Sequence, residues 1–168
     1  DAAQREWILS EYPDLPLHPD RNYFEYVYRS EDLASLPGKD YLSIRRHLNR
    51  FRKNCKPVVE PIDNTSRDEV RDFLIEWCEW KNCDGEPFLA HEKDALIFAL
   101  CHREELGLSG LLIRVVDKVG AISLFEPLNR ETLVVHFEKG LPDCEGIYKA
   151  INAETAFYTR ERFRFINR

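Results

Sequence analysis

The sequence predicts an α+β fold in which helices flank a mixed β-sheet, and three observations support this class. First, short segments bounded by turn residues, at 111–116, 119–125 and 132–137, predict strands, and apolar and polar residues alternate in the last of them. Second, apolar residues recur every three or four positions in the segments around these strands, as they do on one face of a helix. Third, a length of 168 residues suffices for one compact core.

The first 55 residues are expected to form a connector, a strand and a basic helix. Residues 1–22 combine a short helical pattern with three prolines, which favour an extended path. A strand is predicted at 23–28 and a helical turn at 31–36. Apolar positions spaced by three and four predict an amphipathic helix over 40–53. The cations on and just after this helix, with no acidic residue among them, are Arg45, Arg46, Arg50, Arg52, Lys53 and Lys56.

The remaining residues predict strands and helices in a defined order. A strand at 56–62 is followed by a helix that opens with a capping box of Ser66 and Glu69, and by a second helix over 89–105. Three sequential strands joined by turns then form an antiparallel meander. A glycine-bearing loop, a helix from Ile147 and a last strand complete the chain. This order is the layout of the GNAT-like (acyl-CoA N-acyltransferase-like) fold.

Polar groups crowd the end of the strand that begins at Thr132. Alternation puts His136 and Glu138 on the same side of this strand, where either could act as the general base that transfer to an amine or hydroxyl requires. An exposed His and Glu pair at a strand end is also a common hydrogen-bonding edge without a catalytic role. Both interpretations stay open at this point.

The helix after the loop begins at Gly146, and the free N–H groups of its first turn could hold a phosphate. Asp143 and Glu145 would repel an anion, so a glycine required only by the turn is the alternative. Tyr148 and Asn152, one helical turn apart, could donate hydrogen bonds to a substrate or form polar groups at the edge of the core.

The charge distribution suggests an anionic partner for the basic helix. Its cations suit the phosphates of tRNA, of an anionic lipid or of a cofactor. The alternative is a solvated face that packs on the acidic remainder of the protein. A net charge of −6 argues against general DNA binding.

The cysteines and histidines argue against a disulfide framework and against a metal site. Five cysteines, an odd number without paired close spacing, predict no disulfide framework and favour a reducing, cytoplasmic setting. Cys78 and Cys83 lack a second cysteine pair, and the histidines lie far apart in sequence, so we expect no metal site.

Two segments, 36–51 and 136–168, resemble the family built on the C-terminal domain of phosphatidylglycerol lysyltransferase, formerly a domain of unknown function. The first has a leucine-x-glycine-lysine turn, an aromatic residue and a basic helix that ends in asparagine and phenylalanine. The second has a histidine-x-glutamate-lysine strand end, a glycine-x-tyrosine helix start and an isoleucine-asparagine-arginine strand. Ile44 and Arg46 depart from the pattern. The matching residues are Gly38, Lys39, Tyr41, Arg45, Asn49, Phe51, His136, Glu138, Lys139, Gly146, Tyr148, Ile151, Asn152, Asn167 and Arg168.

The resemblance implies tandem GNAT-like folds, in which 1–55 ends a preceding unit and 56–168 forms a GNAT-like domain that is cut short at its carboxyl end. It implies transfer of an acyl or aminoacyl group from acyl-CoA or aminoacyl-tRNA to an amine or hydroxyl, with membrane phospholipid among the acceptors. We expect a cytoplasmic domain whose parent protein is membrane-associated. The loop 139–146 lacks the usual acetyl-CoA glycine pattern, which favours the alternative of a non-catalytic GNAT-like module that binds a ligand or a partner.

Carried onto this sequence, the resemblance assigns roles to individual residues. The catalytic candidates are His136 and Glu138, which polarise the acceptor, with Lys139 and Asn167, which steady the developing oxyanion or the donor. Activity further requires a wedge between two diverging strands that admits a phosphorylated carrier beside His136. The residues expected to bind substrate or donor are Arg45, Arg46, Asn49, Gly146, Tyr148, Asn152 and Arg168.

Overall fold

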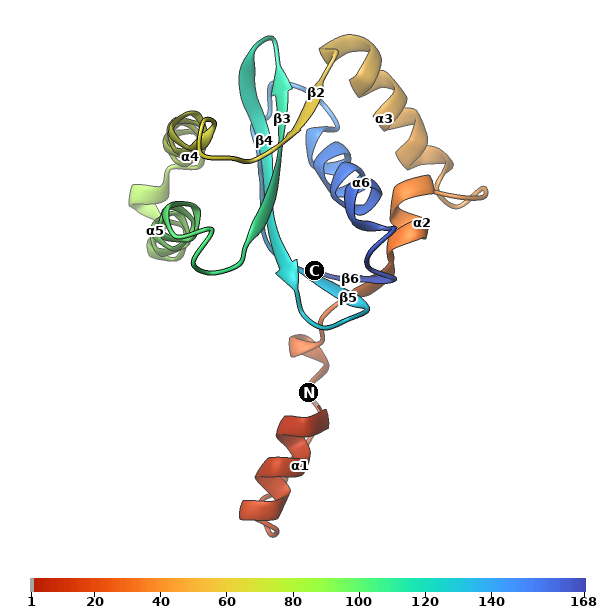
Figure 1. The fold of residues 1–168 in the computed structure, drawn as a ribbon, viewed down its shortest axis with the longest axis vertical. Coiled ribbons are helices and arrows are strands. Elements are labelled where there is room, and N and C mark those ends of the chain that lie inside the picture. The colour runs from red at the N-terminus through yellow and green to blue at the C-terminus, as the bar shows by residue number, and fades with distance from the viewer. Residues whose placement is uncertain (1) are drawn as a thin grey trace.

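A computed structural model describes residues 2–168, so the first residue of the predicted connector lies outside the described part (Figure 1). The helices are α1 (Ala2–Glu11), α2 (Ser30–Ser35), α3 (Leu42–Cys55), α4 (Arg67–Lys81), α5 (Pro87–Cys101) and α6 (Ile147–Thr159), with short 3-10 turns η1 (Arg21–Tyr23) and η2 (Cys83–Gly85). The strands are β1 (Val27–Arg29), β2 (Val58–Pro61), β3 (Ser109–Val115), β4 (Lys118–Pro127), β5 (Thr132–Gly140) and β6 (Phe165–Asn167).

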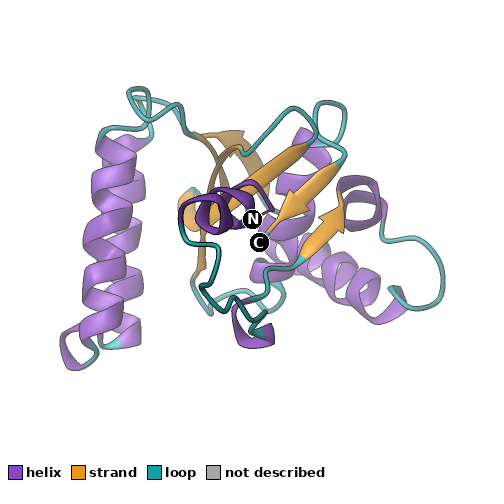
Figure 2. Ribbon diagram, turned by 90° about the horizontal axis from the view of Figure 1, so that it is seen from below, coloured by secondary structure: helices purple, strands orange, loops and turns teal. Residues whose placement is uncertain are grey.

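Six strands form one mixed sheet in the order β1-β6-β5-β4-β3-β2. Neighbouring strands run antiparallel except β5 and β6, which are parallel and are connected by the crossover helix α6. Helices α4 and α5 cover one face of the sheet, and α2, α3 and α6 cover the other (Figure 1). Figure 2 shows the same arrangement from below, with helices on both sides of the strands. The predicted α+β class with a flanked mixed sheet is confirmed.

The central strands are buried on both faces, which explains why they are apolar at nearly every position. On β4, Ala121 and Phe125 pack toward α6, whereas Ile122 and Leu124 pack toward α4 and α5. Fully buried helix side chains, such as Ile151 of α6, cover each face of the sheet. Successive side chains within 119–125 therefore point in turn into one core and into the other, and neither of these two sets faces solvent.

The first strand begins later than the sequence predicts. The prediction was 23–28, whereas η1 takes 21–23 and β1 comprises Val27–Arg29 at the edge of the sheet, where it pairs with β6 alone. All three residues of β1 are exposed, so their apolar side chains gave no core pattern that would fix the boundary. Helix α1 extends away from the sheet at the bottom of Figure 1. Although β1 joins the same sheet as the later strands, the division of the chain at residue 55 stays a prediction.

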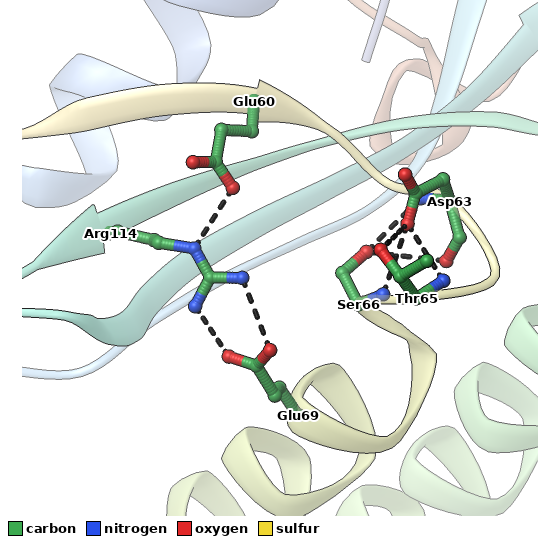
Figure 3. Close-up of polar contacts among 6 residues, drawn as sticks. All are labelled: Glu60, Asp63, Thr65, Ser66, Glu69 and Arg114. Atoms are coloured by element: carbon green, nitrogen blue, oxygen red, sulfur yellow. Dashed lines mark hydrogen bonds and ion pairs between the residues drawn. The ribbon is translucent and has the colours of Figure 1, made fainter.

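The predicted capping box of α4 is wrong, because other groups satisfy the turn before the helix (Figure 3). The Asp63 carboxylate accepts hydrogen bonds from the N–H groups of Thr65, at 2.8 Å, and Ser66, at 3.0 Å. The Ser66 hydroxyl in turn accepts from the N–H of Asp63 at 3.0 Å and makes no cap to the helix. Asp63 therefore organises this turn as an Asx turn, and Glu69 is left free for a different partner.

That partner is Arg114 of β3, which ties the sheet to α4 (Figure 3). Its Nε donates to the Glu60 carboxylate on β2 at 2.9 Å, and its two terminal nitrogens donate to the Glu69 carboxylate on α4. A guanidinium bound in this forked manner gives a directional ion pair. The contact with Arg114 lowers the pKa of Glu69, and the hydrogen bonds from Thr65 and Ser66 lower the pKa of Asp63.

Acid is expected to destabilise the fold through Glu69 and Asp63. Because both folded-state pKa values lie below the ordinary 4.5 and 3.8, the stabilisation is complete above these values and is lost as pH falls through the folded pKa values. Replacing Glu69 with Gln should lower the Tm at neutral pH, and the difference from the parent should shrink as pH falls below about 4. Thermal unfolding followed across this pH range, with Glu79→Gln on the exposed side of α4 as the control, measures the effect. A Tm difference that stays constant with pH would contradict it.

The expectation of free cysteines is also wrong. The structure contains disulfides between Cys55 and Cys144 and between Cys78 and Cys83, and Cys101 is the free cysteine among the described residues. The first pair lies 89 residues apart, a separation from which no spacing rule predicts a bond. The second pair joins the end of α4 to η2. The cysteine count therefore gives no support to a reducing compartment.

Candidate functional site

The candidate site lies along the second half of β5, after the residues that pair with β6. The parallel ladder with β6 covers Thr132↔Phe165, Leu133↔Ile166 and Val134↔Asn167. From residue 135 to Gly140, β5 continues beside β4, and no described strand pairs with its other edge.

A β-bulge at His136 separates the two predicted bases. Leu124 of β4 pairs with Phe137, and the next residue, Phe125, pairs with Val135, so His136 is the extra residue on β5. Phe137 packs with the core under α4 and α5, whereas Val135 packs with the core under α6. Regular alternation therefore breaks between these positions.

The consequence is that His136 and Glu138 have different surroundings. His136 Nε2 lies 2.7 Å from a carboxylate oxygen of Glu126, and both side chains are 37% exposed. Glu138 instead lies on the α6 side, where it contacts Arg168 and Asn152. The prediction that His136 and Glu138 share one side of the strand is wrong, because a bulge depends on the partner strand and leaves no mark in the alternation itself.

Glu138 is a buried carboxyl with a defined set of partners. Its side chain is 8% exposed and forms an ion pair with Arg168. In the amide orientation that satisfies both of its polar atoms, the Asn152 oxygen accepts from Arg168 Nε at 3.0 Å and from Nη1 at 2.7 Å, and its NH₂ faces Glu138. Burial raises the pKa of Glu138, and the charge of Arg168 and the hydrogen bond from Asn152 partly offset this rise. The arrangement favours a carboxyl that binds a proton more readily than an exposed one does.

Ser123 lies directly across the ladder from Glu138. Opposite residues on neighbouring antiparallel strands point to the same face, so the Ser123 hydroxyl faces α6 beside the carboxyl. Ser123 has no exposed surface, and its Oγ has no hydrogen-bond partner among the described residues. Buried polar groups of this kind are costly within an apolar core, which makes this position a candidate functional site.

Beside Glu138 opens a cavity of about 350 Å³ between α2, α3 and α6. Asn152 and Arg168, the two partners of Glu138, line it together with Tyr148. The remaining wall is largely apolar and aromatic. Those residues are Tyr28, Leu33, Leu36, Tyr41, Ile44, Lys149 and Ala153. An apolar pocket with a few convergent polar groups is the usual form of a small-molecule site.

Lys139 lies on the opposite face of β5 from Glu138, and its ammonium group already forms an ion pair. Its Nζ is 2.7 Å from a carboxylate oxygen of Glu92 on α5 and 4.5 Å from the ring centroid of Trp77 on α4. The Trp77 Nε1–H donates to the Tyr148 hydroxyl at 3.3 Å. The Tyr148 ring also reaches Gly140, where an added Cβ would lie 3.4 Å from it. Tyr148 therefore connects the cavity under α6 with the Lys139 side of the strand.

Asn167 and the residues of the basic helix have separate positions. Asn167 is 6% exposed and donates a hydrogen bond to Glu25. Arg45 donates to the backbone carbonyls of Leu36 and Gly38, the latter at 2.7 Å, so it closes the turn after α2. The remaining two candidates on this helix, Arg46 and Asn49, are exposed, and their side chains form no hydrogen bond or ion pair within 2–168.

Gly146 is required by the packing of α3 against α6. Its φ is +97°, a left-handed conformation that favours glycine. An added Cβ would lie 3.5 Å from the carbonyl oxygen of His47 and from Cβ of Phe51, both on α3. Glu145 beside it forms an ion pair with Arg50 at 3.1 Å. The start of α6 is therefore covered by α3, which supports the turn-only interpretation of this glycine.

The predicted site residues thus fall into separate groups. Glu138, Tyr148, Asn152 and Arg168 gather at one cavity, whereas His136 and Lys139 lie on the other side of β5. Arg45, Arg46, Asn49 and Gly146 belong to α3 or to its contact with α6. Partners that the sequence did not reveal are Glu25, Glu92, Glu126, Trp77 and Ser123. Each lies in an element remote in sequence or on a neighbouring strand, so only the register and the packing identify it.

The crossover from β5 through α6 to a parallel β6, after an antiparallel meander, defines a GNAT-like fold. The chain belongs to the family described as phosphatidylglycerol lysyltransferase, C-terminal, whose model matches residues 3–167. No curated protein sequence matches it. The predicted family and fold are confirmed.

Solved structures agree with this family. A conserved protein of unknown function from Bacteroides thetaiotaomicron VPI-5482 is 36% identical, with a TM-score of 0.89 over 99% of this chain and 57% of that chain. The C-terminal DUF2156 domain of a protein assigned as a lysylphosphatidylglycerol synthetase from Agrobacterium fabrum is 14% identical, with a TM-score of 0.67 over 96% and 51%. L-PGS from Bacillus licheniformis is 13% identical, with a TM-score of 0.60 over 85% and 45%.

The chain spans about half the length of these solved relatives. Among the helices of residues 2–168, none is both long and apolar enough to cross a bilayer.

Proposed function

We propose that the chain carries the transfer site of an acyl- or aminoacyltransferase, with Glu138 as its general base. The observation that carries the proposal is the buried Glu138 carboxyl on β5, held by Arg168 and Asn152, which line the neighbouring cavity. Membership of the lysyltransferase family supports aminoacyl transfer within this class. The donor is an aminoacyl-tRNA or an acyl-CoA, and the acceptor is an amine or hydroxyl, of which a phospholipid hydroxyl is one example.

In the proposed step, the Glu138 carboxylate takes the proton from the acceptor hydroxyl or amine as that group attacks the donor carbonyl. The tetrahedral intermediate then expels the tRNA hydroxyl oxygen or the CoA thiolate, which takes the proton back from the Glu138 carboxyl and so regenerates the carboxylate. Arg168, exposed in part and fixed by Asn152, is the cation nearest to the carboxylate and stabilises its charged form between turnovers. Desolvation raises the pKa of Glu138 and the charge of Arg168 lowers it. This balance suits Glu138 to proton transfer.

His136, Lys139 and Asn167 remain proposals in supporting roles. The Glu126 carboxylate orients the His136 ring, which makes His136 the alternative base for an acceptor that approaches the other face of the bulge. Lys139 is neutralised by Glu92, so its proposed contact with an oxyanion requires that this ion pair open. Asn167, bound to Glu25, is best suited to hold β1 against the end of β6.

A non-catalytic binding module is the second candidate, and one observation favours it. The start of α6, where a donor phosphate was expected, is covered by α3, and Arg45 is used by a turn. A module of this kind would retain the cavity and bind a ligand without transfer.

The test measures transfer and binding together. The chain is incubated with aminoacyl-tRNA or acetyl-CoA as donor and with phosphatidylglycerol vesicles or a small primary amine as acceptor, and the labelled product is separated. Transfer that depends on Glu138 supports the proposal. Donor binding without product supports the binding module, and neither binding nor transfer with any of these pairs would overturn both.

A further inference from the structure

A second cavity, about 380 Å³ in volume, lies at the other end of the sheet from Glu138. It is lined by residues of the turn before β5, whereas Glu138 lies near the end of that strand, about 20 Å further along. Five arginines from three separate segments meet there. These are Arg29, Arg130, Arg160, Arg162 and Arg164. None of them belongs to the proposed transfer site.

Backbone hydrogen bonds fix the three segments relative to one another. The N–H of Ser30, after β1, donates to the carbonyl of Arg164 at 3.0 Å. The N–H of Phe165 donates to the carbonyl of Glu131 at 2.9 Å. These bonds hold the ends of β1 and β6 and the turn before β5 together, so Arg29, Arg130 and Arg164 have backbone positions set by the sheet, while Arg160 and Arg162 lie in the turn after α6.

The cavity holds more positive charge than its own carboxylates neutralise. Arg160 contacts Glu31 at 3.5 Å and Glu161 at 3.6 Å. The other four arginines form no ion pair within the described residues, and of the acidic residues in the lining only Glu131 remains. Five arginines against three glutamates leave a local charge of +2 in a chain whose net charge is −6. Arg29, Arg130, Arg162 and Arg164 are exposed, so water and salt screen their mutual repulsion, and the local positive field remains available to attract an anion.

Two of these guanidinium groups are held over aromatic rings. The guanidinium carbon of Arg162 lies 5.0 Å from the ring centroid of Phe163, and that of Arg164 lies 5.1 Å from that of Phe165. Stacking limits the rotamers of a long side chain and leaves the edge of the guanidinium, with its N–H donors, free for a ligand.

Ser30 adds an unused hydroxyl to the same cavity. It lines the cavity, is 1% exposed, and its Oγ has no hydrogen-bond partner among the described residues. A buried hydroxyl without a partner costs free energy that a bound acceptor would recover. Its position among arginines makes an oxyanion the fitting acceptor.

We propose that this cavity binds a phosphate group of a small ligand, either inorganic phosphate or a phosphomonoester. Planar guanidinium forks match the oxygens of phosphate, and four arginines without carboxylate partners suit a doubly charged anion. A cavity of about 380 Å³ suits a compact ligand, whereas an RNA strand would need basic residues along a longer surface. This site is independent of the proposed transfer reaction, because it neither contains nor contacts Glu138.

Calorimetric titration of the chain with inorganic phosphate and with glycerol phosphate tests the proposal. Both should bind, and Arg130→Gln or Arg164→Gln should each weaken binding about tenfold through the loss of a charge-assisted hydrogen bond. The matched control Arg67→Gln removes one exposed arginine from the start of α4 and should leave the affinity unchanged. Ser30→Ala, which removes no charge and no existing hydrogen bond, should weaken binding as well, and circular dichroism verifies that each variant is folded.

Separate titrations distinguish the other sources of phosphate. A single-stranded RNA oligonucleotide and vesicles of phosphatidylglycerol are each tested against the same variants. Binding of RNA or vesicles without binding of the small phosphates would overturn the proposal. So would the absence of phosphate binding at millimolar concentration, or an equal loss of affinity in Arg67→Gln.

Discussion

Replacing Glu138 with glutamine is expected to lower the rate of transfer at least about a hundredfold and to leave the fold intact. Glutamine has nearly the same shape, so it can keep the hydrogen bond from Arg168, but it cannot take a proton from the acceptor. Loss of a general base typically costs two to four orders of magnitude, whereas loss of a mere packing contact would mainly affect stability. The measurement is the single-turnover rate of transfer with saturating donor.

Two controls separate the role of a base from other roles of Glu138. His136→Gln removes the alternative base on the other face of β5, and Glu79→Gln removes an exposed carboxyl from α4 that lies outside both proposed sites. If Glu138→Gln transfers at the parent rate while His136→Gln does not, the assignment moves to His136. Parent rates in both variants would remove both residues from the mechanism.

The pH dependence of stability gives an independent test of the burial of Glu138. Because burial raises its folded-state pKa, the protonated form stabilises the fold below the ordinary pKa of 4.5, and this contribution is lost as pH rises through the folded pKa. The glutamine variant should therefore gain stability relative to the parent as pH rises from acid to neutral, the opposite sign from Glu69→Gln. Thermal unfolding of the parent and of both variants across this range compares the two slopes.

The sequence predicts elements well where one periodic pattern decides the outcome. The helix expected from Ile147 appears as Ile147–Thr159, because Ile151 and Thr155 continue the buried stripe and Gly146 can adopt the positive φ before it. The strand expected at 132–137 appears as Thr132–Gly140. In both cases the burial that stabilises the element follows from residues within that element.

Features that depend on a remote partner could not be predicted in this way. The bulge at His136 follows from how β5 meets β4, and the single residue it inserts changes the face on which His136 lies. Glu69 satisfies the sequence pattern of a capping box, yet Arg114, which is 45 residues away in the chain, offers a stronger charged partner. Family resemblance supplied Glu138, Tyr148, Asn152 and Arg168 as candidates, and only the packing of α6 against β5 and β6 shows that they meet at one cavity.

Removing the disulfide between Cys55 and Cys144 is expected to have the largest effect on stability among substitutions outside the core. The bond joins the end of α3 to the loop before α6, and it closes a loop of 89 residues. In the chain-entropy treatment, a loop of this length limits the unfolded state by about 4 to 5 kcal/mol, whereas the loop between Cys78 and Cys83 contributes about 2 kcal/mol. The double variant Cys55→Ala/Cys144→Ala should therefore unfold at markedly lower urea concentration than Cys78→Ala/Cys83→Ala.

Two further measurements, a thiol titration and unfolding with a reductant, test whether these bonds form in the protein. Titration of thiols in the unfolded, unreduced chain should find one reactive cysteine, Cys101, and Cys101→Ala should leave the urea midpoint unchanged. A reductant should lower the midpoint of the parent to that of a variant lacking both bonds, because it removes the same two constraints on the unfolded chain. Five reactive thiols without reductant, or equal midpoints for the two double variants, would contradict the ranking, since loop length is the property that distinguishes the two bonds.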